Sequence, residues 1–286
     1  MRFLQHQLSP NYYKLERQIA SSGLMLDIKL ISDKKIDGYT LLEGFPGIGL
    51  VGPMALSYVI EKLNMEYYGY FESQAFPPLV SIHNSIPMHP VRIYFSTKYK
   101  LVAIFAEFAI PSEMTYIMSK KISDFIKENK IERIISIGGM PSQSISSELS
   151  ETDVEKQKED EEQAEKVFAV ISNPDMASEL KKAGISIISE GVATGISAML
   201  MINATSEKVK DTNLLVQVDQ SIVDPKYAEI AIKSINKLLD LKIDITELDK
   251  EAQEIEAKIR DVIKKNRDSH QSYKEATDAA GPSMYA

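Results

Sequence analysis

The chain has 286 residues, of which 44% are hydrophobic and 26% are charged, and its formal net charge is -8 at pH 7. This composition is typical of a globular protein with one large or two small domains and enough apolar material for a core. The acidic balance argues against a nucleic-acid surface, because phosphate binding needs clustered Lys and Arg, whereas here acidic residues are interspersed with them. The sequence contains no cysteine, which excludes disulfides, thiolate metal sites and a cysteine nucleophile.

Two further observations concern the compartment. Residues 1–7 lack the apolar core of a signal peptide, and the best internal apolar run, Val192–Ala204, is too short to span a bilayer. Cysteine-free composition fits a reducing environment. We therefore expect a cytoplasmic protein that is not inserted in a membrane.

Alternating strand-like and helix-like patterns run through the first half of the chain, as an α/β domain requires. A short apolar strand at Tyr39–Glu43 precedes a glycine-rich turn, and the pattern then predicts a helix over Ile48–Leu63. The remaining elements of this half are strands at Tyr67–Phe71, Val91–Thr97 and Leu101–Phe108, a helix at Glu113–Glu128, and a strand at Arg133–Ile137.

A polar stretch then interrupts the pattern. Residues 142–166 are rich in Glu, Asp and Lys and poor in apolar residues, so we expect an acidic loop, either a solvated helix or a mobile connection. The α/β pattern resumes after this loop. It predicts strands at Val167–Ile171, Ile185–Ser189 and Leu214–Asp219, and helices at Pro174–Ala183 and Ile196–Ala204.

The C-terminal region has helical periodicity. One apolar stripe comprises Ala228, Ile232, Ile235 and Leu239, and a second, with heptad spacing, comprises Ile245, Leu248, Ala252, Ile255, Ile259 and Val262. The second stripe fits either a hairpin packed on the domain or an intermolecular coiled coil. We therefore divide the chain into an α/β core at 1–243, a heptad-patterned helix at 244–266, and a flexible tail at 267–286.

Three glycine turns follow predicted strands. Their glycines are Gly44, Gly47 and Gly49 in the first turn, Gly138 and Gly139 in the second, and Gly191 and Gly195 in the third. If the strands are parallel, all three turns lie at the carboxyl edge of the sheet. The first turn lacks the Lys and Ser/Thr of a P-loop, and Pro46 removes one N–H donor. We therefore favour tight turns and close helix packing over phosphate binding.

Only a few titratable residues stand in positions that could indicate a catalytic site. Glu43 and Glu190 stand at similar positions in their turns and could meet as a carboxylate pair, although such residues more often cap helices. His83 and His89 flank Pro87, but a metal site would need a third ligand. No Ser, His and Asp arrangement stands in a nucleophile-elbow context. We predict no catalytic residues, no bound metal and no cofactor.

The last three residues favour a binding function. Met284, Tyr285 and Ala286 end a tail that contains Gly281 and Pro282. An aliphatic side chain, an aromatic ring and a terminal carboxylate together suit an apolar pocket with a basic residue at its floor. The ring would supply the anchor and the carboxylate a charge-assisted bond.

The sequence also resembles a known family across roughly residues 24–255. The segments that carry the likeness are Gly44–Gly52, Ile137–Pro141, Gly191–Leu200 and the helix that begins at Pro225. In combination and order they resemble the archaeal proteasome-assembly-chaperone family. The resemblance implies a mixed α/β sheet flanked by helices, similar to the purine nucleoside phosphorylase fold, without catalysis as a family trait. The acidic loop at 142–166 is longer than the resemblance implies.

The resemblance also implies partners. Family members are expected to form homo-oligomers and to bind α-subunits of the 20S proteasome, and the terminal tripeptide matches the hydrophobic-tyrosine-any motif that proteasome activators insert between α-subunits. We therefore expect an ATP-independent assembly chaperone or adaptor whose docking residues are Met284, Tyr285 and Ala286. Two alternatives remain: a nucleoside phosphorylase or hydrolase working at the glycine turns, and a passive oligomeric scaffold with an inert tail.

Overall fold

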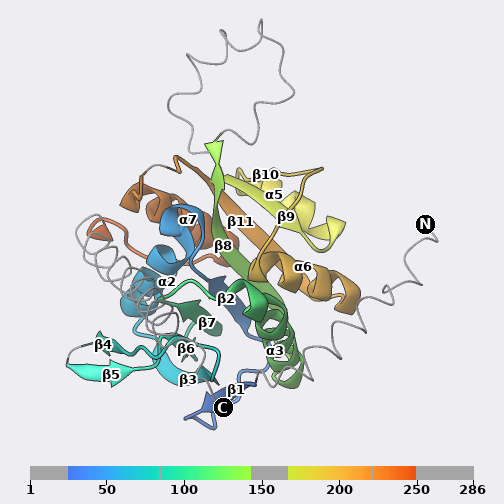
Figure 1. Cartoon of the computed structure of the whole chain (residues 1–286). Coiled ribbons are helices and arrows are strands. Elements are labelled where there is room, and N and C mark those ends of the chain that lie inside the picture. The colour runs from blue at the N-terminus through green and yellow to red at the C-terminus, as the bar shows by residue number, and fades with distance from the viewer. Residues whose placement is uncertain (1–24, 84, 143–166, 221, 249–286) are drawn as a thin grey trace, which may run out of the picture.

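The computed structural model describes residues 25–83, 85–142, 167–220 and 222–248, and a nine-stranded mixed sheet forms its centre (Figure 1). The strand order is β1-β3-β6-β7-β2-β8-β11-β9-β10. The strands are β1 (Leu26–Leu30), β2 (Thr40–Gly44), β3 (Glu66–Ser73), β6 (Val91–Ser96), β7 (Leu101–Ala106), β8 (Arg133–Pro141), β9 (Val167–Ile171), β10 (Ser186–Ile187) and β11 (Lys210–Val218).

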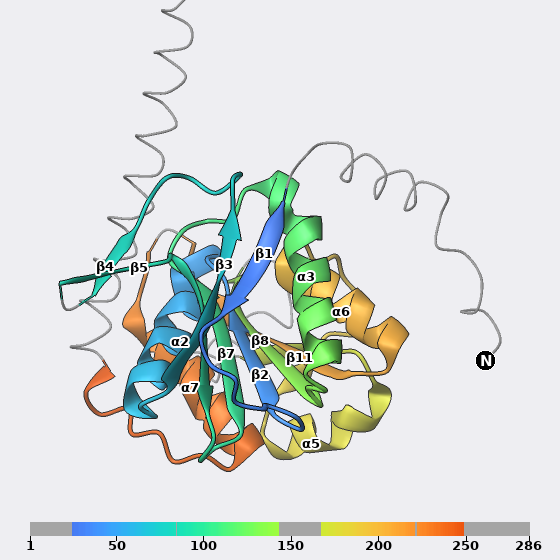
Figure 2. The same ribbon diagram turned by 90° about the horizontal axis from the view of Figure 1, so that it is seen from below.

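Helices cover both faces of the sheet. Figure 2 shows α2 and α7 on one side of the strands and α3 and α6 on the other. The helices are α2 (Val51–Lys62), α3 (Thr115–Glu128), α5 (Ala177–Lys182), α6 (Ile196–Glu207) and α7 (Pro225–Leu239), with short 3-10 turns η1 (Ile48–Leu50), η2 (Ser112–Met114) and η4 (Pro174–Met176). The predicted α/β class, with a large mixed sheet flanked by helices, is confirmed.

The sheet has two cores, one on each face. The core under α2 and α7 includes Leu42 and Ile135, whereas the core under α3 and α6 includes Leu41 and Ile134. Adjacent strand residues divide between the faces because side chains alternate along a strand. β7 reads Leu-Val-Ala-Ile-Phe-Ala and is buried throughout, as expected for a strand with helices on both faces.

Local sequence signals start two of the helical segments. The Asn173 side chain accepts a 3.0 Å hydrogen bond from the Asp175 N–H before η4. Asp224 accepts a 2.8 Å bond from the Lys226 N–H before α7, which has Pro225 in its first turn. Both caps satisfy N–H groups that a helix start leaves without a partner.

Two parts of the described fold differ from the predictions. β1 was not predicted, and neither was the separate hairpin of β4 (Ser81–His83) and β5 (Ile86–Met88). The described chain also stays on the domain beyond residue 243, since Leu248 is 1% exposed and belongs to the core under α2 and α7. Most of the acidic loop (143–166), most of the predicted C-terminal helix (249–266) and the whole tail (267–286) lie outside the described residues.

Candidate functional site

The first two glycine turns pack directly against each other. β2 pairs with β8 in parallel, so Gly44, the last residue of β2, and Gly139, near the end of β8, lie at the same edge. A methyl group added at Gly139 would collide with the Ile48 carbonyl, and one added at Gly52 would collide with the Ile137 carbonyl. Gly49 adopts φ 68, in the left-handed region that favours glycine. The glycines here therefore let η1 and α2 approach the sheet closely.

The third turn is built differently. β9 runs antiparallel to β11, and β10 is parallel to β9, so β10 ends at the opposite edge from β8 and β11. Residues 188–195 then return to the start of α6, where Gly195 has φ 90 (Figure 1). The predicted equivalence of the first and third turns is therefore wrong for the strand that precedes the turn, because that strand runs in the opposite direction.

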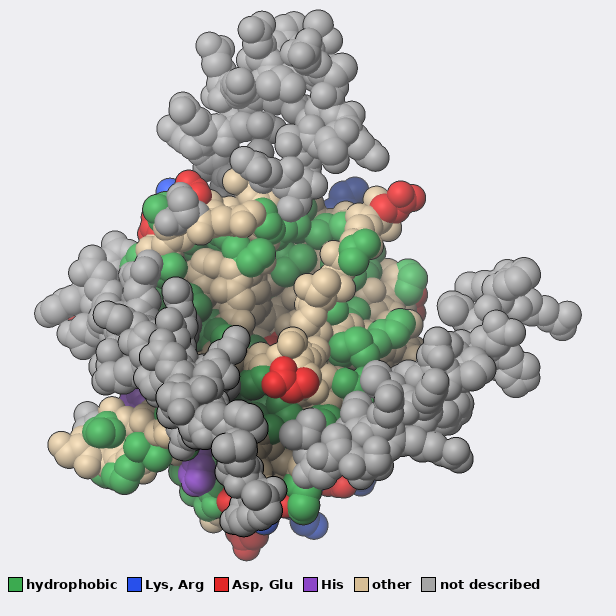
Figure 3. All heavy atoms as spheres, viewed as in Figure 1, with side chains coloured by type: hydrophobic (Ala, Val, Ile, Leu, Met, Phe, Trp, Pro, Cys, Tyr) green, Lys and Arg blue, Asp and Glu red, His purple; other side chains and the backbone are tan. Residues whose placement is uncertain are grey.

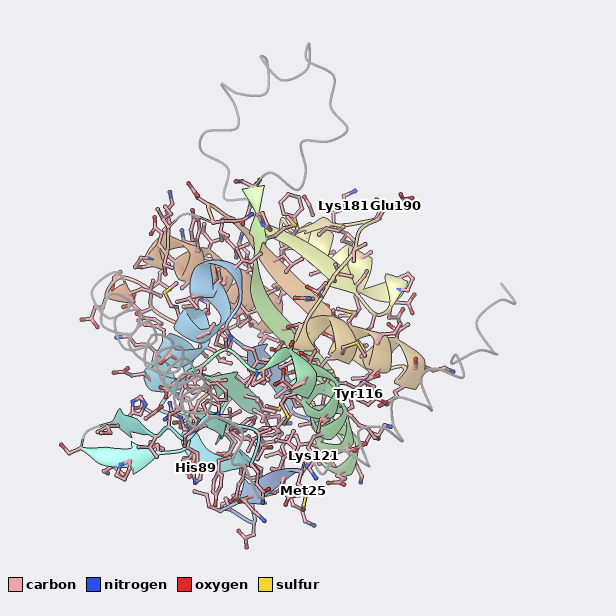
Figure 4. The ribbon with its side chains drawn as sticks, viewed as in Figure 1. Met25, His89, Tyr116, Lys121, Lys181 and Glu190 are labelled. Atoms are coloured by element: carbon pink, nitrogen blue, oxygen red, sulfur yellow. The ribbon has the colours of Figure 1, made fainter. Side chains whose placement is uncertain are left out.

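Glu43 and Glu190 do not form a pair. Glu43 is fully buried in β2, whereas Glu190 is exposed, and Figure 4 places it at the periphery of the molecule. The partner that Glu43 has instead comes from α6: Ser197 Oγ donates a 2.8 Å hydrogen bond to Glu43 Oε2. The Phe45 N–H lies 3.3 Å from Glu43 Oε1, and the Ser136 hydroxyl is a further partner.

Burial raises the pKa of Glu43, although its hydrogen bonds to Ser136, Ser197 and the Phe45 N–H oppose the rise. Asp211, at the start of β11, is also buried, and its pKa is raised well above its ordinary value, first by burial and second by the charge of Glu43. Sequence reasoning missed Asp211. In the sequence, Asp211 stands close to the apolar run Leu214–Val216, where an acidic residue is unusual. That position could have drawn attention to it.

This pair of acids is a poor candidate for catalysis. Both side chains are 0% exposed, so a substrate has no described route to them. Within the described residues, no ion pair or side-chain hydrogen bond joins either carboxyl to a Lys or Arg that could hold a phosphate. The raised pKa values of the two carboxyls favour their protonated forms. The hydrogen bond from Ser197 to Glu43 fixes the start of α6 against the end of β2.

A second buried polar cluster lies under the β4–β5 hairpin. The guanidinium of Arg92, on β6, donates from Nη2 to Glu107 Oε1 at 2.6 Å, and His83 Nε2 lies 2.8 Å from the same oxygen. Burial by itself would raise the pKa of Glu107, but the contact with His83 and the charge of Arg92 outweigh it and leave that pKa lowered. Arg92 also lies over the Phe105 ring, 5.0 Å from its centroid.

The two histidines named in the sequence have different surroundings. His83 contacts Glu107, whereas His89 stacks on Tyr70 with ring centroids 3.6 Å apart. Across the part of the chain that the structure describes, no group of three or more His, Asp or Glu residues could hold a metal ion.

The predicted docking residues Met284, Tyr285 and Ala286 lie outside the described residues.

No helix within the described ranges combines the length and the apolar composition that crossing a bilayer requires.

Comparison with known proteins gives a family-level match. The model of the PAC2 family matches residues 41–263. An uncharacterized protein of Methanocaldococcus jannaschii is 26% identical over 242 residues, which cover 84% of this chain and 92% of the relative. A second uncharacterized protein of the same organism is 22% identical over 249 residues, 84% of this chain and 91% of the relative.

Solved structures share the fold. Pyrococcus furiosus PbaA, described as an archaeal homolog of proteasome-assembly chaperone, superposes with a TM-score of 0.72 at 24% identity, over 86% of this chain and 100% of that one. Pyrococcus furiosus PbaB, described as an archaeal proteasome activator, gives a TM-score of 0.64 at 24% identity, over 83% and 98% of the two chains.

Proposed function

Because this chain belongs to the PAC2 family, we propose that it binds the 20S proteasome as an assembly chaperone or as an adaptor or activator, without using ATP. The observation that carries the proposal is the coincidence of this family with the terminal Met284-Tyr285-Ala286. Structures with the same fold include one described as a homolog of proteasome-assembly chaperone and one described as a proteasome activator.

In this proposal the tail is the docking element. The Tyr285 ring fills an apolar pocket between neighbouring proteasome α-subunits, Met284 packs beside it, and the Ala286 carboxylate pairs with a basic side chain. The chain acts as a homo-oligomer, so several tails engage one ring, and the effective concentration of the second tail strengthens binding.

Tyr285→Ala in the full-length protein is the direct test. A buried aromatic anchor is typically worth at least about 2 kcal/mol, so we expect binding to immobilised 20S particles to weaken by at least about thirtyfold per tail. Tyr273→Ala is the matched control, because Tyr273 belongs to the same predicted tail but not to the motif. One residue added after Ala286 should weaken binding almost as much, since it displaces the carboxylate. Wild-type binding by both the Tyr285→Ala and the extended chain contradicts the proposal.

The glycine-turn edge lends little support to the phosphorylase or hydrolase alternative. The first two turns fill the space that a phosphate would need with the Ile48 carbonyl and the Val51 side chain, which would crowd even a methyl group at Gly139. Glu43 and Asp211 are enclosed by the sheet and α6.

A further inference from the structure

Strand β4 of the β4–β5 hairpin turns its polar side chains toward the domain and its apolar side chain outward. In a hairpin packed on a domain, apolar side chains normally face the domain and polar side chains face water. Here Ser81 and His83 face inward, since Ser81 is buried and His83 Nε2 lies 2.8 Å from Glu107 Oε1. Side chains alternate along β4, so Ile82 faces outward and is 68% exposed.

The outward face is apolar beyond this one residue. Val80, two residues before Ile82 and on the same face, is 64% exposed. Pro87 is the register partner of Ile82 and adds a further apolar side chain to the outer face. Figure 3 shows hydrophobic side chains gathered on this projecting hairpin. We call Val80, Ile82 and Pro87 the outer hairpin face.

Contacts hold the hairpin in this orientation. The Ser81–His83 strand lies against the Arg92–Glu107 ion pair, and His89, just after β5, stacks on Tyr70 of β3. The Glu107 N–H donates a 2.9 Å bond to the Pro90 carbonyl at the end of the same loop. The apolar face is thus fixed outward at both ends of the hairpin, which suits a surface that another segment covers.

The described chain ends in a suitable place for that segment. Lys62 Nζ, at the end of α2, lies 2.7 Å from Glu247 Oε2, and Tyr58 Oη donates a 2.8 Å bond to the Asp244 carbonyl. Figures 1 and 2 both place α2 and the hairpin on the same side of the molecule. β3 begins four residues after Lys62, and the chain leads from its far end to the hairpin.

The sequence that follows has the required pattern and length. Leu248 is buried in the core, and Ala252, Ile255, Ile259 and Val262 continue its helical stripe. As a helix, residues 249–262 would be about 21 Å long. From Glu66 at its start to Tyr70, on which His89 stacks just after the hairpin, β3 extends only about 13 Å. A helix that starts beside Lys62 and follows the direction of β3 therefore reaches the hairpin.

From these observations we propose that residues 249–262 pack their apolar stripe against the outer hairpin face of the same chain. This contact fixes the place from which the C-terminal tail leaves the domain. It does not depend on what the tail binds, so its tests use no proteasome.

Cysteine cross-linking tests the contact, because the native sequence contains no cysteine. In the full-length chain we expect Ile82→Cys with Ile255→Cys to form an intramolecular cross-link with a short bismaleimide. One control pairs Ile82→Cys with Ala257→Cys, which faces the opposite side of the predicted helix. The other pairs Ile255→Cys with Ile202→Cys, a residue 56% exposed on α6. The yield of the first pair should exceed that of both controls by about fivefold, independently of protein concentration.

Two results overturn the proposal. Equal yields for all three pairs show that residue 255 has no preference for the hairpin. A product of twice the chain mass shows that a second copy covers the outer hairpin face instead.

Hydrogen exchange, measured without a cross-linker, checks the same contact. Ile82→Asp should raise hydrogen exchange of residues 249–262 by about tenfold, because a charged side chain removes the apolar surface on which they pack. Ile31→Asp, at a residue 58% exposed elsewhere, is the matched control. Unchanged exchange in the Ile82→Asp chain contradicts the contact whatever the outcome of any 20S binding assay.

Discussion

Ser197 Oγ lies 2.8 Å from Glu43 Oε2, a hydrogen bond that joins the first turn of α6 to the end of β2 across 154 positions of sequence. Removing the hydroxyl leaves one carboxyl oxygen of a fully buried residue with one partner fewer. We predict that Ser197→Ala lowers the free energy of unfolding by about 1–2 kcal/mol. Urea denaturation measures the change. Ser206→Ala, on the same helix but exposed, should change stability by less than about 0.5 kcal/mol.

The buried Asp211 should make stability fall as pH rises. Its folded pKa is raised above the unfolded value of about 3.9, so between these two values the folded state binds more protons than the unfolded state. The stability that this group contributes is therefore present at low pH and is lost as pH rises through that window. Asp211→Asn removes the titrating group.

We accordingly predict that Asp211→Asn gains stability over the wild type at pH 7 to 8 and gains less near pH 4, measured by thermal melts across this range. Each pKa unit of difference corresponds to about 1.4 kcal/mol. Asp33→Asn, at an exposed position, serves as the control. A difference between Asp211→Asn and wild type that is the same at both pH values would show that Asp211 titrates alike in both states.

The Arg92–Glu107 ion pair should tolerate joint replacement better than the loss of one partner. Arg92→Met leaves a buried carboxylate without its cation, and we expect a loss of about 3–5 kcal/mol. The double variant Arg92→Met/Glu107→Leu should recover most of that loss, because both desolvated charges are gone. Urea unfolding of the two single variants and the double variant gives the coupling energy. A double variant less stable than Arg92→Met refutes this account.

The same pair predicts an acid dependence of opposite sign to that of Asp211. The pKa of Glu107 is lowered in the folded state, so its stabilising contribution is present above the unfolded value of about 4.3 and is lost as pH falls through the folded pKa. Arg92→Met removes one cause of the lowering. We expect the stability cost of Arg92→Met to be smaller near pH 3 than at pH 7, as thermal melts at the two values would show.

Gly139 should be far less replaceable than Gly47. A methyl group at Gly139 would collide with the Ile48 carbonyl, which the backbone of η1 holds in place, so we predict that Gly139→Ala costs about 2–3 kcal/mol of stability. Gly47 has φ -146 and open space where a methyl group would lie, so Gly47→Ala should be nearly neutral. Differential scanning calorimetry of both variants checks the contrast. Equal melting temperatures would mean that η1 shifts freely.

Most strands of the central sheet and the helices that flank it were predictable because their patterns are local, whereas the edge strand β1 was not predicted. Val167–Ile171 was predicted with the bounds that β9 has, and the helix at Glu113–Glu128 matches η2 and α3 together. Tight turns with glycine also followed from the sequence. The likeness to purine nucleoside phosphorylases, the oligomeric state and the division at residues 243 and 266 stay predictions.

Strand direction and burial of single polar residues could not be predicted in the same way. Whether β10 ends at the same edge as β8 depends on how β9 pairs with β11. These two strands are far apart in sequence, so local patterns do not indicate their relative direction. Glu43 reads as a turn residue in sequence, and its burial depends on Ser197, far along the chain. The β4–β5 hairpin was missed because its strands have three residues each and β4 turns Ile82 outward and Ser81 inward, against the usual alternation.

The sheet ends in strands that are poor templates for another chain. At one edge β10 has only two residues, and at the other β1 carries Asp27 and Lys29 among its five. Short or charged edge strands hinder edge-to-edge pairing, the first step of β-aggregation. The described edges of the sheet therefore disfavour association by strand addition and leave side-chain surfaces, which point mutations can strengthen or weaken.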